Sequence, residues 1–295
     1  MRADHPGEPM GRLCKLLGCS RQNWYKHKKH ESKKALELEI VVQMVKEWRI
    51  KQPKVGTRKL MIHLREGLER NGIKIGRDAL FALLDSRGLL VRRRKKKAVT
   101  TDSNHPYRKY PNLVKDFIPL RANELWVCDI TYLDTLEGFA YLFLITDAYS
   151  HKIVGHCVAE TLEARWAIAA LRQALAQRTS DHVLLHHSDR GSQYCSQDYV
   201  GILKEHSAAI SMTENGDPYE NAVAERINGI IKNELLPDAL RSKKEARQLI
   251  AQAVETYNNV RLHASVDMLT PAIAHTMTGL LKNHWKPKAK LKNAA

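Results

Sequence analysis

Three acidic residues of the chain have the types and the spacing expected of a carboxylate site. Asp129 lies in the middle of a β-prone run, where a carboxylate that is neither paired nor bound to a cation costs several kcal/mol. Asp189 follows a short apolar run and begins a turn rich in Gly and Ser, and 35 residues separate it from Glu225. Carboxylates brought together from separate elements repel one another and raise one another's pKa. Such a group therefore indicates a bound divalent cation.

These three side chains offer only oxygen ligands. Oxygen-only ligation is typical of Mg²⁺ or Mn²⁺ and not of Zn²⁺. We therefore expect Mg²⁺, or Mn²⁺ in its place. Taken singly, Asp189 would more often form a turn and Glu225 would more often be a surface residue, so the joint spacing carries the prediction. A rival acid, Asp147, is expected to cap a turn.

The helix that carries Glu225 has a clear start signal in the sequence. Asp217 is a suitable N-cap residue, and Pro218 suits the first helical position. At about 100° per residue, four polar residues fall within about 60° of one another: Asn221, Glu225, Asn228 and Lys232. Apolar residues cover the opposite side: Val223, Ala224, Ile227, Ile230, Ile231 and Leu235. The pattern predicts a helix with an apolar back and a polar stripe that faces the site.

Four spaced motifs extend this carboxylate pattern. In chain order they are W-V-C-D-I-T-Y, H-S-D-R-G-S-Q-Y, Y-E-N-A-V-A-E-R-I-N-G and Y-N-N-V-R-L-H. With them, the chain resembles the D,D(35)E transposases of bacterial insertion sequences of family three (their second-frame product), whose catalytic core is similar to that of retroviral integrases. The resemblance covers about residues 10–280. It implies that Asp129, Asp189 and Glu225 are both catalytic residues and metal ligands.

Alternating β-prone and helical patterns follow residue 124. Strands are predicted over 125–133, 139–146, 152–159, 183–187 and 208–212, with helices over 162–178 and 197–206 before the Glu225 helix. This order is that of the α/β ribonuclease-H-like fold of integrase catalytic cores. In that fold the first and fourth strands are adjacent and parallel, which would bring Asp129 beside Asp189.

The positive charge of the chain is concentrated near its N-terminus. The net charge is +16, and residues 1–110 hold 28 Lys and Arg against 11 Asp and Glu. Residues 111–295 hold 20 against 21. This asymmetry predicts a nucleic-acid-binding part joined to a nearly neutral enzymatic part.

Several cations are candidates for DNA contact. Residues 10–29 have a helix-turn-helix outline, and residues 53–90 resemble a second such unit of the same transposases. In the second unit, the expected DNA-facing residues are Arg58, Lys59, Lys74 and Arg77. Lys232 has the spacing to reach a phosphate next to the cleaved bond, and Asn221, one turn before Glu225, is a weaker candidate for contact with DNA.

Six consecutive cations follow the helical modules: Arg92, Arg93, Arg94, Lys95, Lys96 and Lys97. Such a run does not pack, so we expect a linker that follows DNA phosphates, with a nuclear address as the alternative interpretation. The predicted organisation is a helix-turn-helix-like segment over 1–34, a second such all-α domain over 35–91, a basic linker over 92–120, the catalytic core over 121–285 and a basic tail over 286–295.

The sequence also bears on membrane contact, on cellular location and on the state of the cysteines. No apolar run approaches the 18 or so residues needed to cross a membrane, and no signal-peptide pattern opens the chain, so we expect no membrane contact and a bacterial cytoplasmic location at the nucleoid. Five cysteines without a C-x-x-C pair fit reduced thiols. A zinc site from Cys14, Cys19, His27 and His30 is the alternative to core packing, but its spacing is poor.

The resemblance implies a DNA transposase that cleaves the ends of an insertion sequence and joins a 3′-hydroxyl to a new phosphodiester. Its partners would be double-stranded DNA at the element ends and target, further copies of the chain on that DNA, and a helix-turn-helix protein from an upstream reading frame. A ribonuclease-H-type nuclease is the first alternative, and a domesticated DNA-binding regulator is the second.

Overall fold

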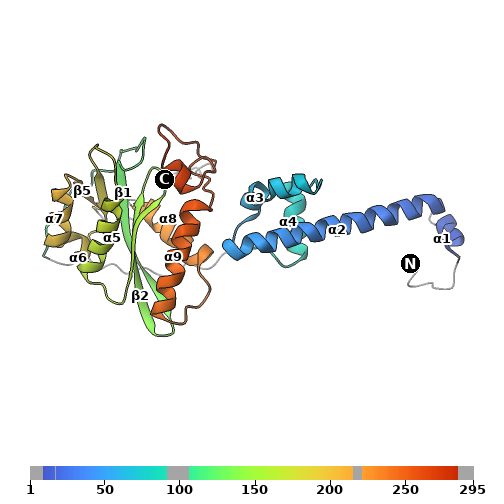
Figure 1. Ribbon diagram of the computed structural model, residues 1–295, viewed down its shortest axis with the longest axis horizontal. Helices are drawn as coiled ribbons and strands as arrows, with labels where there is room; N and C mark the ends of the chain where they lie inside the picture. Colours follow the sequence, from blue (N-terminus) through green and yellow to red (C-terminus); the bar gives the residue numbers. More distant parts are fainter. Residues whose placement is uncertain (1–8, 17, 92–105, 215–220, 285–295) are drawn as a thin grey trace, which may run out of the picture. The chain divides into compact units, whose positions relative to one another are not determined.

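The computed structural model describes residues 9–16, 18–91, 106–214 and 221–284. The described residues divide into two compact units, one made of helices near the N-terminus and one built on a five-stranded sheet (Figure 1). Predictions that fall on residues 92–97 or 286–295, or on Asp217 and Pro218, lie outside the described residues.

The first unit contains helices α1 (Met10–Leu16), α2 (Arg21–Lys51), α3 (Thr57–Arg70) and α4 (Arg77–Ser86). Helix α2 runs without interruption from the predicted N-terminal segment into the predicted second domain. Residues 21–51 contain no Gly or Pro, and the pair Lys33–Glu37 lies at helical i,i+4 spacing with 3.8 Å between Nζ and Oε1. The proposed boundary between 34 and 35 therefore lies inside a helix.

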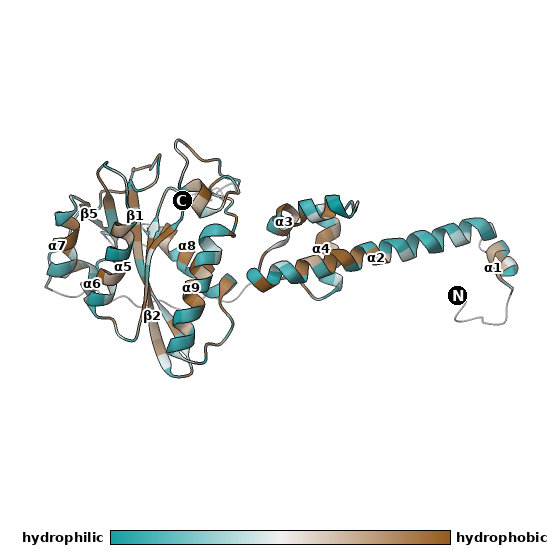
Figure 2. Ribbon diagram, in the orientation of Figure 1, coloured by the Kyte–Doolittle hydropathy of each residue, from teal (hydrophilic) through white to brown (hydrophobic). Residues whose placement is uncertain are grey.

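Apolar residues from three helices form the core of this unit. They include Val41 and Val45 from α2, Leu60 and Leu64 from α3, and Leu80 and Leu84 from α4. Figure 2 shows the remainder of α2, toward α1, as mostly hydrophilic. Thr57 is the first residue of α3, and Gly56 occupies the N-cap position without a side-chain hydrogen bond.

The second unit is organised around a mixed sheet. Strands β1 (Leu125–Thr135), β2 (Gly138–Asp147) and β3 (Ile153–Ala159) pair antiparallel, and β4 (Leu185–Ser188) and β5 (Ala209–Met212) continue in parallel from β1. The strand order is β3-β2-β1-β4-β5. Both the ribonuclease-H-like fold and the parallel pairing of the first and fourth strands are therefore confirmed.

Helices cover both faces of the sheet (Figure 1). On one face lie α5 (Ala164–Ala176), α6 (Ser192–Cys195) and α7 (Gln197–Glu205); on the other lie α8 (Ala222–Ile230), the π-helix η2 (Ile231–Leu235) and α9 (Lys243–Asn259), with α10 (Pro271–Ala274) against α9. Side chains alternate between faces along a strand. Trp126 and Cys128 of β1 pack under α5 and α7, whereas Leu133 packs with α8 and α9. The odd-numbered residues of β1, Asp129 among them, therefore face α8.

Candidate active site

The pairing of β1 with β4 brings two of the three predicted acids together. Val127 lies opposite His187 in the parallel register. The same offset relates Asp129 to Asp189, two residues further along each chain segment. Asp189 is the first residue after β4, so its backbone lies beside the middle of β1, where Asp129 is.

The carboxylate of Asp129 is held by hydrogen bonds at both oxygens. The backbone N–H of Ile130 donates to Oδ1 at 2.9 Å, and the Nδ2 of Asn228 donates to Oδ2 at 2.8 Å. Burial raises the pKa of Asp129 from 3.8 to about 7; the charges of Asp189 and, more weakly, Glu225 raise it too, whereas the two hydrogen bonds lower it. The three predicted acids are therefore electrostatically coupled in the folded chain.

A tight turn fixes Asp189. The backbone N–H of Gly191 donates to its Oδ1 at 3.0 Å, and the Ser188 hydroxyl donates to its backbone carbonyl at 2.9 Å. A Cβ at Gly191 would lie 3.0 Å from both Oδ1 of Asp189 and Oε1 of Gln193. The glycine therefore gives the carboxylate room. Gln193 donates to the carbonyl of Leu162 at 2.8 Å, which ties the turn to the segment before α5.

The polar stripe of the Glu225 helix lies against β1. Asn221 donates through Nδ2 to the carbonyl of Cys128 at 2.8 Å, and Lys232 donates through Nζ to Oγ1 of Thr131 at 3.1 Å. Together with the Asn228 bond, these contacts join the helix to Cys128, Asp129 and Thr131 of β1. Asn221 is only 7% exposed, so its amide contacts the strand and not a surface open to DNA. The apolar back of the helix is core, as predicted.

The three carboxylates are near one another but not gathered into a ready-made ligand set. Asp129 and Asp189 are half-buried, whereas Glu225 is exposed. Among the described residues, no group of three or more His, Cys, Asp or Glu side chains is placed to hold a metal ion. The rival acid Asp147 has the predicted role in a turn, since its buried carboxylate accepts hydrogen bonds from the backbone and the hydroxyl of Ser150 at 2.8 and 2.6 Å.

Sequence reasoning missed a polar cluster on the opposite face of β1. Cys128 Sγ lies 3.0 Å from Nε2 of His186, and the same nitrogen lies 2.9 Å from the hydroxyl of Tyr199. Burial, and then the neighbouring His187, lower the pKa of His186 to about 3, so the imidazole is neutral. The adjacent pair of histidines in an apolar strand was the only signal in the sequence for this cluster.

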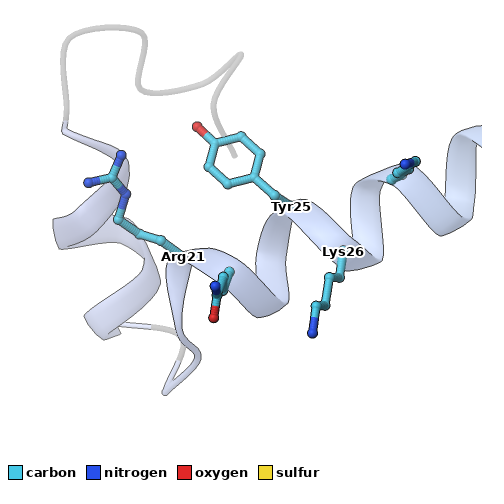
Figure 3. A pocket seen from close by; sticks show the side chains of 5 residues that line it. Arg21, Tyr25 and Lys26 are labelled. Carbon is cyan, nitrogen blue, oxygen red and sulfur yellow. The ribbon is translucent and has the colours of Figure 1, made fainter.

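The predicted DNA-contact residues of the first unit are mostly on its surface. Arg58, Lys74 and Arg77 are exposed and Lys59 is half-buried. Arg77 pairs with its neighbour Asp78 at 2.8 Å. A second group of cations lines an open pocket at the start of α2, where Figure 3 shows Arg21 and Lys26 on either side of Tyr25.

Models of the integrase core domain match residues 119–218 and 206–271. A 31 kDa protein of insertion element IS600 from Shigella sonnei is 36% identical over 88% of this chain and 96% of its own length. The transposase of IS629 from Shigella sonnei is 37% identical over 70% of each chain. The transposase InsF of IS3A from Escherichia coli K12 is 31% identical over 70% of this chain and 73% of its own.

Two solved structures are also similar. The catalytic core domain of HTLV-2 integrase in complex with magnesium is 21% identical, with a TM-score of 0.43, over 54% of this chain and 99% of its own. A chain of the simian T-cell lymphotropic virus intasome in complex with the PP2A regulatory subunit B56 gamma is 18% identical, with a TM-score of 0.47, over 82% of this chain and 77% of its own.

The sheet order and the matches to the integrase core define a polynucleotidyl transferase of the ribonuclease-H-like class. Within that class, the chain belongs to the DNA transposases of bacterial insertion sequences. The resemblance seen in the sequence motifs is thereby confirmed. None of the helices in the described ranges is both long and apolar enough to cross a membrane.

Proposed function

We propose that Asp129, Asp189 and Glu225 are the catalytic carboxylates with which this transposase cleaves element ends and transfers a 3′-hydroxyl to new DNA. The observation that carries the proposal is the electrostatic coupling of Asp129 to Asp189 across the β1–β4 pairing and to Glu225 of α8, whose helix also donates a hydrogen bond to Asp129. Three acids gathered around the middle of β1 are costly to keep ionised unless a cation neutralises them.

The donor set fits a hard divalent cation. It offers carboxylate oxygens only, and the charges of Asp189 and Glu225 disfavour the charged form of Asp129, which a bound cation would reverse. Asp129, Asp189 and Glu225 would hold Mg²⁺ or Mn²⁺, with two ions in the full site. When bound, these ions supply Lewis-acid stabilisation at the phosphoryl group and lower the pKa of the attacking hydroxyl. Asn228 and Ile130 keep the Asp129 carboxylate oriented toward the site.

Lys232 is proposed to bind a phosphate next to the cleaved bond. Its Nζ bonds to Thr131, which lies two residues after Asp129 and therefore on the same face of β1. A half-buried ammonium beside the acids attracts a phosphate oxygen more strongly than a fully solvated one. In Lys232→Ala, strand transfer should fall while calorimetric Mn²⁺ affinity stays near that of the parent.

The excess positive charge supports a DNA-binding role for the region before the core. We assign contact with double-stranded DNA, at element ends and target, to Arg58, Lys59, Lys74, Arg77 and the run 92–97. We further propose that the chain acts as a homo-oligomer on DNA in the bacterial cytoplasm, at the nucleoid, and that an upstream-frame helix-turn-helix protein is a partner.

A strand-transfer assay tests this function against the nuclease alternative. The substrate is a labelled duplex that carries the inverted repeat flanking the coding sequence, together with an unlabelled target duplex and Mg²⁺ or Mn²⁺. Transposition predicts labelled products longer than the substrate. Shortened products alone, at every target concentration, would identify a hydrolytic nuclease instead.

A further inference from the structure

Three side chains of the late motif 257–263 that could do chemistry are buried in the folded chain. Arg261 and His263 are 3% and 4% exposed, and Tyr257, at the end of α9, is fully buried. The guanidinium of Arg261 lies over the Tyr257 ring, 6.0 Å from its centroid. These side chains therefore cannot contact DNA directly, and their polar groups must bond to other residues of the protein.

Arg261 forms a fixed ion pair with Glu234. Its Nη2 and Nε donate to the same carboxylate oxygen, Oε2, at 2.7 and 3.0 Å. Its Nη1 donates to Nε2 of His263 at 2.8 Å, so that nitrogen of the imidazole carries no proton. Both flanks of the guanidinium are thus engaged. Arg261 is buried and Glu234 is half-buried, and an ion pair with a buried member contributes more to a defined position than to net stability.

Glu234 lies in the same π-helical turn as Lys232. The N–H of Leu236 donates to the carbonyl of Ile231 at 3.2 Å, which is the wide i→i+5 bond of a π-helix. In a regular α-helix, Lys232 would lie about 20° around the axis from Glu225. The wide turn changes the direction of each residue that follows Ile231, and π-turns are rare without tertiary support. Arg261 supplies such support through its contact with Glu234, which lies two residues after Lys232.

We infer that Arg261 is a positioning residue that acts through Glu234. By holding the turn Ile231–Leu235, the ion pair keeps Lys232 beside Thr131 and the Asp129 carboxylate. This inference rests on the proposed role of Lys232 as a phosphate ligand. It assigns the late motif to the alignment of the phosphate-binding lysine with the acids.

A double-mutant cycle on the full chain tests the inference. The variant Arg261→Met/Glu234→Leu removes the ion pair without leaving a buried charge. It is combined with Lys232→Ala, and single-turnover strand transfer is measured on the flanking inverted-repeat duplex with Mn²⁺. Arg247→Met/Glu160→Leu, which removes an exposed pair near the other end of α9, is the matched control. Thermal melting by circular dichroism verifies the fold of each variant.

The ion-pair variant should lose about a hundredfold in rate, the scale of a misplaced group, when Lys232 is present. It should lose less than about twofold in the Lys232→Ala background, because coupled sites are non-additive. Equal losses in both backgrounds, or no loss in either, would overturn the inference but leave the lysine's role intact. Full activity of Lys232→Ala alone would overturn the phosphate role and the inference with it.

If the double variant does not fold, Arg261→Lys replaces it in the same cycle. Lysine keeps the positive charge but cannot place two N–H groups on one carboxylate oxygen in a fixed fork. The same dependence on Lys232 is expected, with a smaller loss. A loss that is unchanged by Lys232→Ala would again assign Arg261 a purely structural role.

Discussion

The Nδ2 of Asn228 donates to Oδ2 of Asp129 at 2.8 Å, so the helix that carries Glu225 also orients the acid of the central strand. Asn228 follows Glu225 by less than one helical turn, and one element thus sets the positions of two carboxylates relative to each other. The hydrogen bond favours the ionised form of Asp129, whereas burial and Asp189 favour the protonated form. With a pKa of about 7, this carboxyl titrates near neutral pH in the metal-free protein.

The raised pKa of Asp129 predicts that the stability of the metal-free protein, measured in EDTA, depends on pH. The pKa of Asp129 is raised on folding from 3.8 to about 7, so the stabilisation it contributes is complete below about pH 4 and is lost as the pH rises toward 7. Asp129→Asn removes the titrating carboxyl and with it this pH-dependent contribution to stability. Between pH 4 and 8, the free energy of unfolding of the parent should fall relative to the variant by up to about 4 kcal/mol. Urea unfolding at each pH measures the difference, and parallel curves would contradict the assigned pKa.

Glu225→Gln keeps the shape of the side chain and removes one negative charge. Cleavage and joining should both fall by several orders of magnitude, while binding of end DNA should barely change. In EDTA the variant should be as stable as the parent or slightly more so, and added Mn²⁺ should raise the melting temperature of the parent more. Asp134→Asn, at an exposed acid of the same strand as Asp129, is the control and should retain activity. Joining by Glu225→Gln at the parental rate would move the catalytic acid elsewhere.

Replacing residues 92–97 by a Gly/Ser run should weaken DNA binding on all sequences alike. Phosphate contacts position a protein without reading bases, and each one lost reduces the dependence of the affinity on salt. Fluorescence anisotropy at several salt concentrations, with the inverted-repeat duplex and a scrambled duplex, gives both slopes. A selective loss on the inverted repeat would show that the run reads sequence.

Alanine substitutions at two glycines should change the stability of the protein in opposite directions. A Cβ at Gly155 in β3 would lie 2.3 Å from the carbonyl oxygen of Ala170 in α5, so Gly155→Ala should destabilise the protein by about 1–3 kcal/mol. A Cβ at Gly201 in α7 would meet nothing within 4 Å, and Gly201→Ala should stabilise the protein by up to about 1 kcal/mol. Equal melting temperatures of the two variants would mean that α5 moves away from the sheet readily.

Local patterns determined much of what the sequence predicted correctly. The strands around Asp129 and Asp189 are β-prone runs bounded by turn residues, and turn chemistry is local. The apolar back of the Glu225 helix follows from helical periodicity alone. The cap of α9 is equally local, since the Ser242 hydroxyl accepts a hydrogen bond from the Glu245 N–H three residues later at 3.0 Å.

Only the tertiary structure decided which distant groups meet. That Asn228 bonds Asp129 and Lys232 bonds Thr131 depends on how α8 is seated on β1, and side-chain periodicity gives the face of a helix but not its register on a strand. The same holds for the π-helical turn, which a regular 3.6-residue pattern does not reveal and which Arg261 contacts from beyond α9. Residue types and spacing thus identified the acids, whereas long-range packing set their partners, because those contacts join segments that no local pattern relates.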